Sequence, residues 1–473
     1  MLLAFLRDRQ TDPAEVSSLY RRVGEWFLMK KALKPAYAYL CRAGETERVL
    51  SLLDEEDAIT KDSSEFEGSA EIFAAAPRGL LFRYPLAYLQ YIVGLLLFSG
   101  GGAAARDAVS RLDELEAHYE GLAEIRPGRP GRRDRVLAEI SVARIFVAFN
   151  DARQMLFFTH KALRLLDGGV SCLVKRDAEF TFGSPHFLYT YYREPGSLKE
   201  TAEFMAAEFP AFSRLSSGCG AGCDYVTLAE YALETGDWQA AELNAFKAIY
   251  KAQTMEQTGI ILCSGLTLVR LYLYQGKIGE ALEHLRRLRT DASKEENAVY
   301  STTLDLIEGY AYGCMARPDR IPEWLRTGDH SPANFMYQGM AFPFLVQGKA
   351  LLLEKDYIRL EMLTETLPQS FGIFRNQLGF LHNDILAAAA RYRLYGMKKG
   401  AARLAEAIDM GRADHLILPF AEYAPEITDM LRHLAQNDSR DGYVAELLEA
   451  CERYMESLRR APENPVTLTE REL

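Results

Sequence analysis

Five turn signals recur at nearly constant intervals along the second half of the chain, and this regularity constrains the fold more than any other feature. The signals are Gly236-Asp237, Gly276-Lys277, Arg317-Pro318, Asp356 and Gly396. Intervals of about 40 residues are typical of repeated helical hairpins, in which each unit is a pair of antiparallel helices. One pair cannot bury its apolar face alone, so we expect the pairs to stack into an array with a concave surface.

The residues around the turns support the same fold. The stretch YALETGDWQAAELNAFKAI (Tyr231 to Ile249) places an aromatic residue and a leucine before a Gly-Asp turn and two alanines after it. LYLYQGKIGEALEHLRRL (Leu271 to Leu288) and LYGMKKGAARLAEAIDMG (Leu394 to Gly411) repeat this design, and a degenerate copy follows Asn150-Asp151. Small residues let the two helices approach closely, and glycine supplies the left-handed conformation that ends the first helix. We therefore predict an all-α fold of TPR-like helical hairpins that form a right-handed superhelix.

The chain is expected to divide into three parts. Residues 1–68 open with a well-marked helix, because Asp12 can cap it, Pro13 suits its first turn and Glu15 can complete a capping box. Two short helices are expected to follow, at about 35–41 and 45–53. Residues 69–458 carry the helix pairs, and residues 459–473 begin with a proline-containing linker. A Pro-, Gly- and Arg-rich stretch over 126–135 is expected to be an exposed loop, either a solvated connector or a basic docking loop.

The composition favours a binding protein over a catalyst. The 55 Lys and Arg against 66 Asp and Glu give a formal charge of -11, which argues against this chain itself binding a phosphate backbone. The eight histidines are scattered, and no nucleophile or metalloprotease motif is present, so we expect no enzyme, no catalytic residue and no metal site. The glycine-rich stretches lack the Lys-Ser or Lys-Thr of a phosphate loop, so no cofactor is expected for this chain.

The expected cellular compartment follows from the absence of sequence signals for a membrane span or for secretion. The longest apolar run, over 84–98, contains Gln90 and is shorter than the roughly 20 residues that a membrane span needs, so we expect a buried helix and no membrane association. No cleavage-like site follows the N-terminus, and a signal peptide is therefore not expected. Seven dispersed cysteines are typical of reduced thiols, and we expect a cytoplasmic protein.

An aromatic segment over 184–196 is the first candidate for a ligand site. It contains Tyr189, Tyr191, Tyr192 and Arg193, which cannot all share one face of a helix. Aromatic rings and a guanidinium group suit a sugar, a peptide or an anionic metabolite. The alternative is amphipathic packing with the tyrosine hydroxyls at the rim.

Two further stretches complete the candidate site. Gly220 and Gly222 precede a helix start, where backbone N–H groups can hold an anion, or alternatively form a tight turn that admits a neighbouring helix. Arg375 and Asn376 lie in a second blend of aromatic and polar residues, over 371–384, in which His382 is expected to be structural. Apolar residues over 336–344 are expected on the same concave side.

Separated segments of the chain resemble one family. The last residues include Leu468, Thr469, Arg471 and Glu472, a Leu-Thr-x-Arg-Glu stretch that resembles the first helix of the LuxR-type helix-turn-helix. The segments over 16–53, 182–196 and 414–434 resemble, in the family's order, parts of the large ATP-dependent LuxR-family transcriptional regulators of the maltose-regulon-activator type. The first resembles the stretch after the winged-helix part, and the other two resemble the helical sensor domain.

This resemblance implies a function. It makes the chain the ligand-sensing and self-association region of such a regulator, in which a small-molecule or peptide inducer binds in the groove. ATP, DNA and RNA polymerase would be bound only by the full-length protein, and we expect this chain to be a central piece of it. The alternative is a generic TPR-like protein–protein interaction scaffold that recognises a peptide. The residues before Met1 and after Leu473 would distinguish the two.

Overall fold

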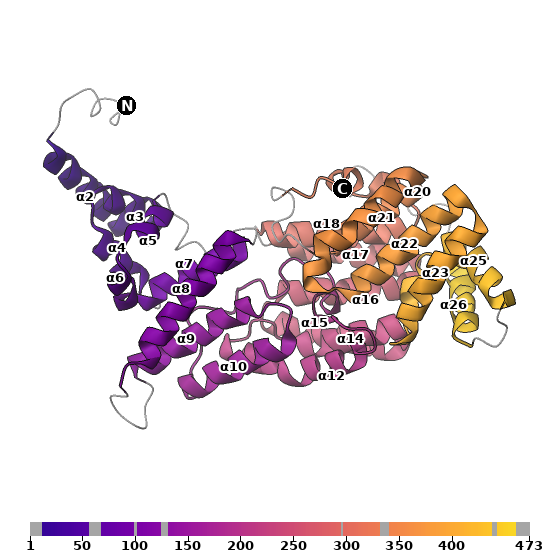
Figure 1. Cartoon of the computed structure of the whole chain (residues 1–473), viewed down its shortest axis with the longest axis horizontal. Coiled ribbons are helices and arrows are strands. Elements are labelled where there is room, and N and C mark those ends of the chain that lie inside the picture. The colour runs from indigo at the N-terminus through magenta and orange to yellow at the C-terminus, as the bar shows by residue number, and fades with distance from the viewer. Residues whose placement is uncertain are drawn as a thin grey trace. The chain divides into compact units, whose positions relative to one another are not determined.

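The fold was analysed in a computed structural model, which describes residues 12–55, 68–98, 102–123, 131–294, 297–331, 340–437 and 442–459. Every regular element in these ranges is a helix (Figure 1). The chain divides into two compact units, which we call unit 1 (Met1–Ala178 with Arg214–Ser217) and unit 2 (Glu179–Ser213 with Gly218–Leu473). The predicted boundary after residue 68 falls inside unit 1, because helices on both sides of it share one core.

Unit 1 is built from short hairpins around an aromatic and aliphatic core. Its helices are α2 (Pro13–Met29), α3 (Leu33–Arg42), α4 (Thr46–Leu53), α5 (Ser69–Ala75), α6 (Arg78–Arg83), α7 (Pro85–Phe98), α8 (Ala103–Glu120), α9 (Arg132–Val147) and α10 (Ala152–Leu166). As predicted, Asp12 caps α2, and its Oδ1 accepts a hydrogen bond from the Ala14 N–H at 3.1 Å. The predicted buried helix over 84–98 is α7, whose Tyr88 and Leu89 are fully buried.

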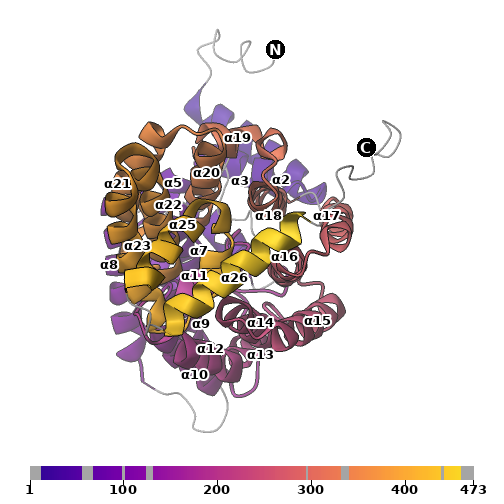
Figure 2. The ribbon, with the colours of Figure 1, turned by 90° about the vertical axis from the view of Figure 1, so that its right-hand side faces the viewer.

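Unit 2 contains the predicted repeats. Its helices are α11 (Leu188–Tyr191), α12 (Leu198–Glu208), α14 (Cys223–Thr235), α15 (Trp238–Thr254), α16 (Thr258–Tyr274), α17 (Ile278–Ala292), α18 (Ala298–Cys314), α19 (Glu323–Thr327), α20 (Phe342–Leu353), α21 (Tyr357–Phe371), α22 (Gln377–Tyr395), α23 (Met397–Arg412), α24 (Leu418–Ala421), α25 (Ala424–Asn437) and α26 (Gly442–Arg459). Short 3-10 turns, η2 (Pro318–Arg320) and η3 (Gly372–Phe374), interrupt the series, and α13 (Pro210–Leu215) spans the division between the units. Successive pairs pack side by side, and α26 packs back against α16 (Figure 2).

The turns inside the pairs form as the sequence predicts. Gly236 takes φ +86° and ends α14, and the Asp237 carboxylate then accepts from the Ala240 N–H at 3.1 Å to begin α15. At the turn before α21, Lys355 takes the left-handed conformation (φ +61°) in place of glycine, and Asp356 caps the helix. The all-helical fold of TPR-like hairpins is thus confirmed over the described residues.

Two predictions need correction, and others fall wholly or partly outside the described residues. The prediction of a loop over 126–135 is wrong for its last four residues, because α9 begins at Arg132 and its first turn contains the Arg-rich residues up to Arg135. Residues 126–130 of this stretch lie outside the described residues. After the Arg317-Pro318 turn the second helix of the pair is reduced to η2 and the five-residue α19. The LuxR-like residues over 468–472, the linker before them and residues 336–339 of the predicted apolar stretch lie outside the described residues. The described part of that stretch, 340–344, includes the start of α20, and its Phe342 is buried. None of the described helices combines the length and the apolar character that a bilayer crossing requires.

Candidate functional site

An irregular segment of unit 2, residues 180–197, lies against the first helices of the repeats, and we call it the inner segment. Its short helix α11 contacts both α14 and α22 and lies between them in Figure 2. The side chains of Phe187, Tyr189, Tyr191 and Tyr192 are at most 5% exposed. The inner segment therefore contributes core side chains to the array although little of it is helical.

Carboxylates from the repeats bind the main chain of the inner segment. Glu230 on α14 accepts hydrogen bonds from the N–H groups of Phe187 (2.8 Å) and Leu188 (2.7 Å). At the C-terminal end of the segment, Asp414 accepts from the N–H groups of Gly196 (2.6 Å) and of Leu198 (2.8 Å), the first residue of α12. Hydrogen bonds to a charged acceptor are stronger than neutral ones, so these two carboxylate clamps hold the segment at its middle and at its C-terminal end.

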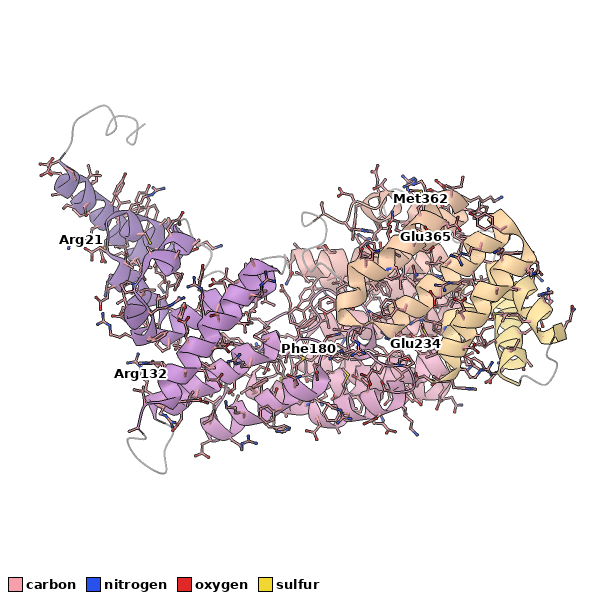
Figure 3. All side chains as sticks on the ribbon, viewed as in Figure 1. Arg21, Arg132, Phe180, Glu234, Met362 and Glu365 are labelled. Carbon is pink, nitrogen blue, oxygen red and sulfur yellow. The ribbon has the colours of Figure 1, made fainter. Side chains whose placement is uncertain are left out.

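Charged and polar side chains meet beneath the inner segment in what we call the central polar cluster. Six of its members come from first helices of the repeats or from the inner segment, and the seventh, Glu422, follows α24. The cluster comprises His186, Glu230, Glu234, Arg270, Tyr310, Lys349 and Glu422. Figure 3 labels Glu234 within unit 2.

Arg270 is the centre of this cluster, and its side chain is 1% exposed. Its guanidinium group binds Glu422 through two parallel hydrogen bonds, Nε to Oε1 at 2.8 Å and Nη2 to Oε2 at 2.9 Å. The same group donates to both carboxylate oxygens of Glu234. Paired carboxylates on both sides satisfy a buried guanidinium, which would otherwise be strongly unfavourable in an apolar helix.

The remaining members complete the network. His186 lies between two carboxylates, with Nε2 at 2.8 Å from Glu234 and Nδ1 at 3.2 Å from Glu230. The hydroxyl of Tyr310 donates to Glu422 Oε2 at 2.6 Å, and Lys349 Nζ donates to the Glu422 carbonyl at 3.2 Å. The Lys349 ammonium also lies 3.6 Å from the centre of the Tyr423 ring, a favourable cation–π distance.

Electrostatics keep the central pair ionised. Burial raises the pKa of Glu230, and this effect outweighs the opposing His186 and backbone N–H groups. Burial acts on Glu234 in the same direction, but the Arg270 charge and the His186 hydrogen bond prevail and hold the pKa of Glu234 well below its usual range. Although burial alone lowers the pKa of Arg270, Glu234 and Glu422 raise it well above its ordinary value. Arg270 and Glu234 therefore both carry their charges at neutral pH.

Comparison with known proteins adds a distant structural likeness. No known protein family matches the sequence, and no curated protein matches it either. A solved structure described as a Rap protein complexed with competence and sporulation factor is similar over 80% of this chain and 99% of that chain, with 12% sequence identity and a TM-score of 0.44.

The structure brings two of the predicted site stretches together. The Gln377 N–H donates to the Tyr192 carbonyl at 3.1 Å, and Gln377 Nε2 donates to the Arg193 carbonyl at 3.0 Å. This places Arg375 and Asn376 beside Tyr192 and Arg193. Asn376 is 3% exposed and caps α22 through Gly379, whereas the Arg375 side chain is 57% exposed and lies 3.7 Å from Glu194.

The predicted tyrosines do not line an open surface. Tyr189, Tyr191 and Tyr192 are buried, and the Tyr192 hydroxyl is hydrogen bonded to Asp414, so the packing alternative describes their geometry. Ligand binding by these rings stays a prediction, and it requires the inner segment to move.

The glycines also serve packing in this conformation. Gly220 takes φ +73°, and a Cβ there would lie 2.6 Å from the ring of Phe180. Its N–H already donates to Gln257 Oε1 at 2.7 Å. At Gly222 a Cβ would lie 2.8 Å from the Ala248 carbonyl. The tight turn that admits a neighbouring element therefore describes this stretch, and anion binding there stays a prediction.

Sequence reasoning missed the central polar cluster, although a signal for it is present. Arg270 is the one charged residue in the otherwise apolar helix Thr258–Tyr274, and Lys349 is the one charged residue in Phe342–Leu353. A lone charge in a buried helix needs a partner, so each predicts a buried ion pair. The identity of the partner is not readable in this way, because Glu422 lies far along the sequence from Arg270.

Proposed function

We propose that this chain is the ligand-sensing and self-association region of a LuxR-type transcriptional regulator, in which an inducer binds on the inner side of the helical array. The resemblance of three separated sequence segments supports the family. We propose further that the chain is not an enzyme, holds no cofactor of its own and works in the cytoplasm. In this proposal it reaches DNA and RNA polymerase only as part of the full-length protein.

One observation carries the binding role. Glu230 accepts two main-chain N–H groups of the inner segment, and Asp414 accepts one from Gly196 and one from Leu198, the residue that follows it. Carboxylates placed in this way can hold a peptide backbone whatever its side chains. The inner side of the array is thus suited to bind an extended chain, and the protein's own inner segment occupies it.

The same geometry suggests how an inducer would act. An inducer that binds where the inner segment lies would favour an arrangement with the segment displaced, and a ligand can shift such an equilibrium only by its difference in affinity for the two arrangements. A sharp switch between them needs about 5.5 kcal/mol. Displacement would also expose the buried rings of Tyr189, Tyr191 and Tyr192, apolar surface that a second copy of the chain can cover.

The second candidate is a peptide-binding scaffold with no link to transcription. The main-chain clamps favour it as much as they favour an inducer site, because they recognise backbone alone. Self-association separates the two, since a scaffold has no need to change its oligomeric state when it binds.

A thermal-shift screen of sugars, peptides and aromatic metabolites, followed by sedimentation of each hit, tests the proposal. Arg375→Ala is the informative variant because its side chain is exposed, and Arg359→Ala, with a 54% exposed side chain on α21, is the matched control. We expect to find a ligand that raises both the melting temperature and the sedimenting mass. The rise in melting temperature should be smaller in Arg375→Ala and unchanged in Arg359→Ala. A ligand that raises the melting temperature without changing the mass favours the scaffold, and an equal shift in both variants places the site elsewhere.

A further inference from the structure

Unit 1 contains a cleft that the proposed function does not use. Its volume is about 530 Å³, within the range of small-molecule sites. One wall is apolar and includes Leu86 on α7, Val136 on α9 and Val170 in the loop after α10. Arg132 and Arg135, from the first turn of α9, lie at its rim, and Figure 3 labels Arg132. These are residues of the Arg-rich stretch that the sequence singled out as a connector or a docking loop.

The carboxylates of the cleft are already bound within unit 1. Glu139 is 3% exposed, and it accepts from Ser171 Oγ (2.6 Å) and from the Cys172 N–H (2.9 Å). Asp54 Oδ1 accepts from the N–H groups of Leu86 and Ala87 at the start of α7. Both acids therefore organise the walls of the cleft.

The two arginines of the cleft, Arg132 and Arg135, are exposed to solvent. The Arg132 side chain is 68% exposed, with one hydrogen bond to the Arg83 carbonyl at 2.6 Å and an ion pair with Asp54 at 3.7 Å. A guanidinium group has five N–H donors in a planar fork, so Arg132 can also bind a carboxylate or phosphate at the rim. Arg135 is exposed one helical turn further along α9.

We propose that this cleft binds a small organic anion with an apolar body, whose charged group is held by Arg132 and Arg135 and whose body packs on Leu86, Val136 and Val170. The site lies outside the repeats of unit 2 and is independent of the inner segment. Two guanidinium groups beside an apolar wall favour a carboxylate over an uncharged isostere, and the wall favours an aromatic or aliphatic acid over an inorganic anion.

The protonation of Asp54 should make anion binding in the cleft depend on pH. Burial raises the pKa of Asp54 to about 6, although the Leu86 and Ala87 N–H groups and Arg132 oppose it. The charged and titratable groups around Asp54 are Arg132, Tyr84 and Tyr119, with Arg135 and Glu139 across the cleft. An anion meets less repulsion when Asp54 is protonated, so the cleft binds it more tightly below about pH 6 than above.

Fluorine NMR of the whole chain with para-fluorobenzoate tests the proposal, with uncharged para-fluorobenzamide as the control probe. We expect the benzoate signal alone to broaden strongly.

Variants of the cleft test the roles of its residues. Arg135→Gln should weaken benzoate binding about tenfold, and Val170→Trp, at a position that is 51% exposed, should weaken it by filling the cleft. Arg106→Gln, an exposed position on α8 outside the cleft, is the matched control and should change nothing. Asp54→Asn keeps the Oδ1 acceptor for the Leu86 and Ala87 N–H groups but removes the negative charge. It should therefore strengthen benzoate binding at about pH 8, where Asp54 is ionised.

Three results would overturn the proposal. They are equal broadening of the two probes, equal binding by Arg135→Gln and Arg106→Gln, and weaker benzoate binding by Asp54→Asn than by the wild type. Arg135→Gln and Val170→Trp both replace exposed side chains, so neither should change the melting temperature. An unchanged melting temperature then shows that each variant is folded.

Discussion

The two units treat charge in opposite ways. In unit 2, Arg270, Glu234 and Glu422 are at most 1% exposed in their side chains and form ion pairs with one another. In unit 1, Asp54 and Glu139 face inward and hold backbone, while the Arg132 side chain is 68% exposed at the rim of a cleft. A charge that is fully paired inside a helical array fixes how its elements fit together. A charge left at a rim remains able to bind a ligand.

The largest effect should come from breaking the central polar cluster. Arg270→Met leaves Glu234 and Glu422 buried without their common partner, which should destabilise the fold by about 3–5 kcal/mol in urea denaturation. The matched control is Arg287→Met on α17, whose side chain is 70% exposed and pairs with Glu283. We expect less than about 1 kcal/mol there. Equal effects of the two substitutions would show that the buried cluster is no more important than a surface ion pair.

A smaller effect is expected at the end of the inner segment. Asp414→Asn keeps one acceptor oxygen for the Gly196 and Leu198 N–H groups and the Tyr192 hydroxyl, where the carboxylate supplies two. The loss should be about 1.5–3 kcal/mol of unfolding free energy. Asp409→Asn, at an 81% exposed side chain on α23, is the control and should be nearly neutral. A neutral Asp414→Asn would mean that the clamp does not hold the inner segment.

The smallest expected effect is on how the stability of the folded chain depends on pH. Burial raises the pKa of Glu426 to about 7, above the value of about 4.3 expected for the unfolded chain. The folded state therefore binds the proton more tightly, and stability from this group falls as pH rises from about 4 to about 7. Glu426→Gln should raise the melting temperature at about pH 8 and leave it unchanged at about pH 4. A variant that is less stable than the wild type at pH 8 would contradict this assignment.

Local features were predictable from the sequence, and long-range pairing was not. The turns at Gly236 and Asp356 follow from the conformational preferences of a few neighbouring residues, so their positions were correct. The sequence offered packing of the tyrosines as an alternative to ligand binding, but it did not predict that Arg193 and Arg375 lie close together, because that depends on which segment covers the array. The prediction of a loop over 126–135 was wrong for residues 132–135, since Gly131 can begin a helix as readily as it can continue a loop.

Hydrogen exchange at the Phe187 and Leu188 amides tests most directly the central claim, that buried carboxylates hold the inner segment in the array. In the wild-type chain we predict that both amides exchange as slowly as the core of α14, since their N–H groups are bound to the buried Glu230. In Glu230→Gln, where one carboxylate oxygen is replaced by an amide donor, exchange should accelerate at least about tenfold while α14 itself stays protected. Exchange of the wild-type amides at the rate of an unstructured peptide would contradict the account.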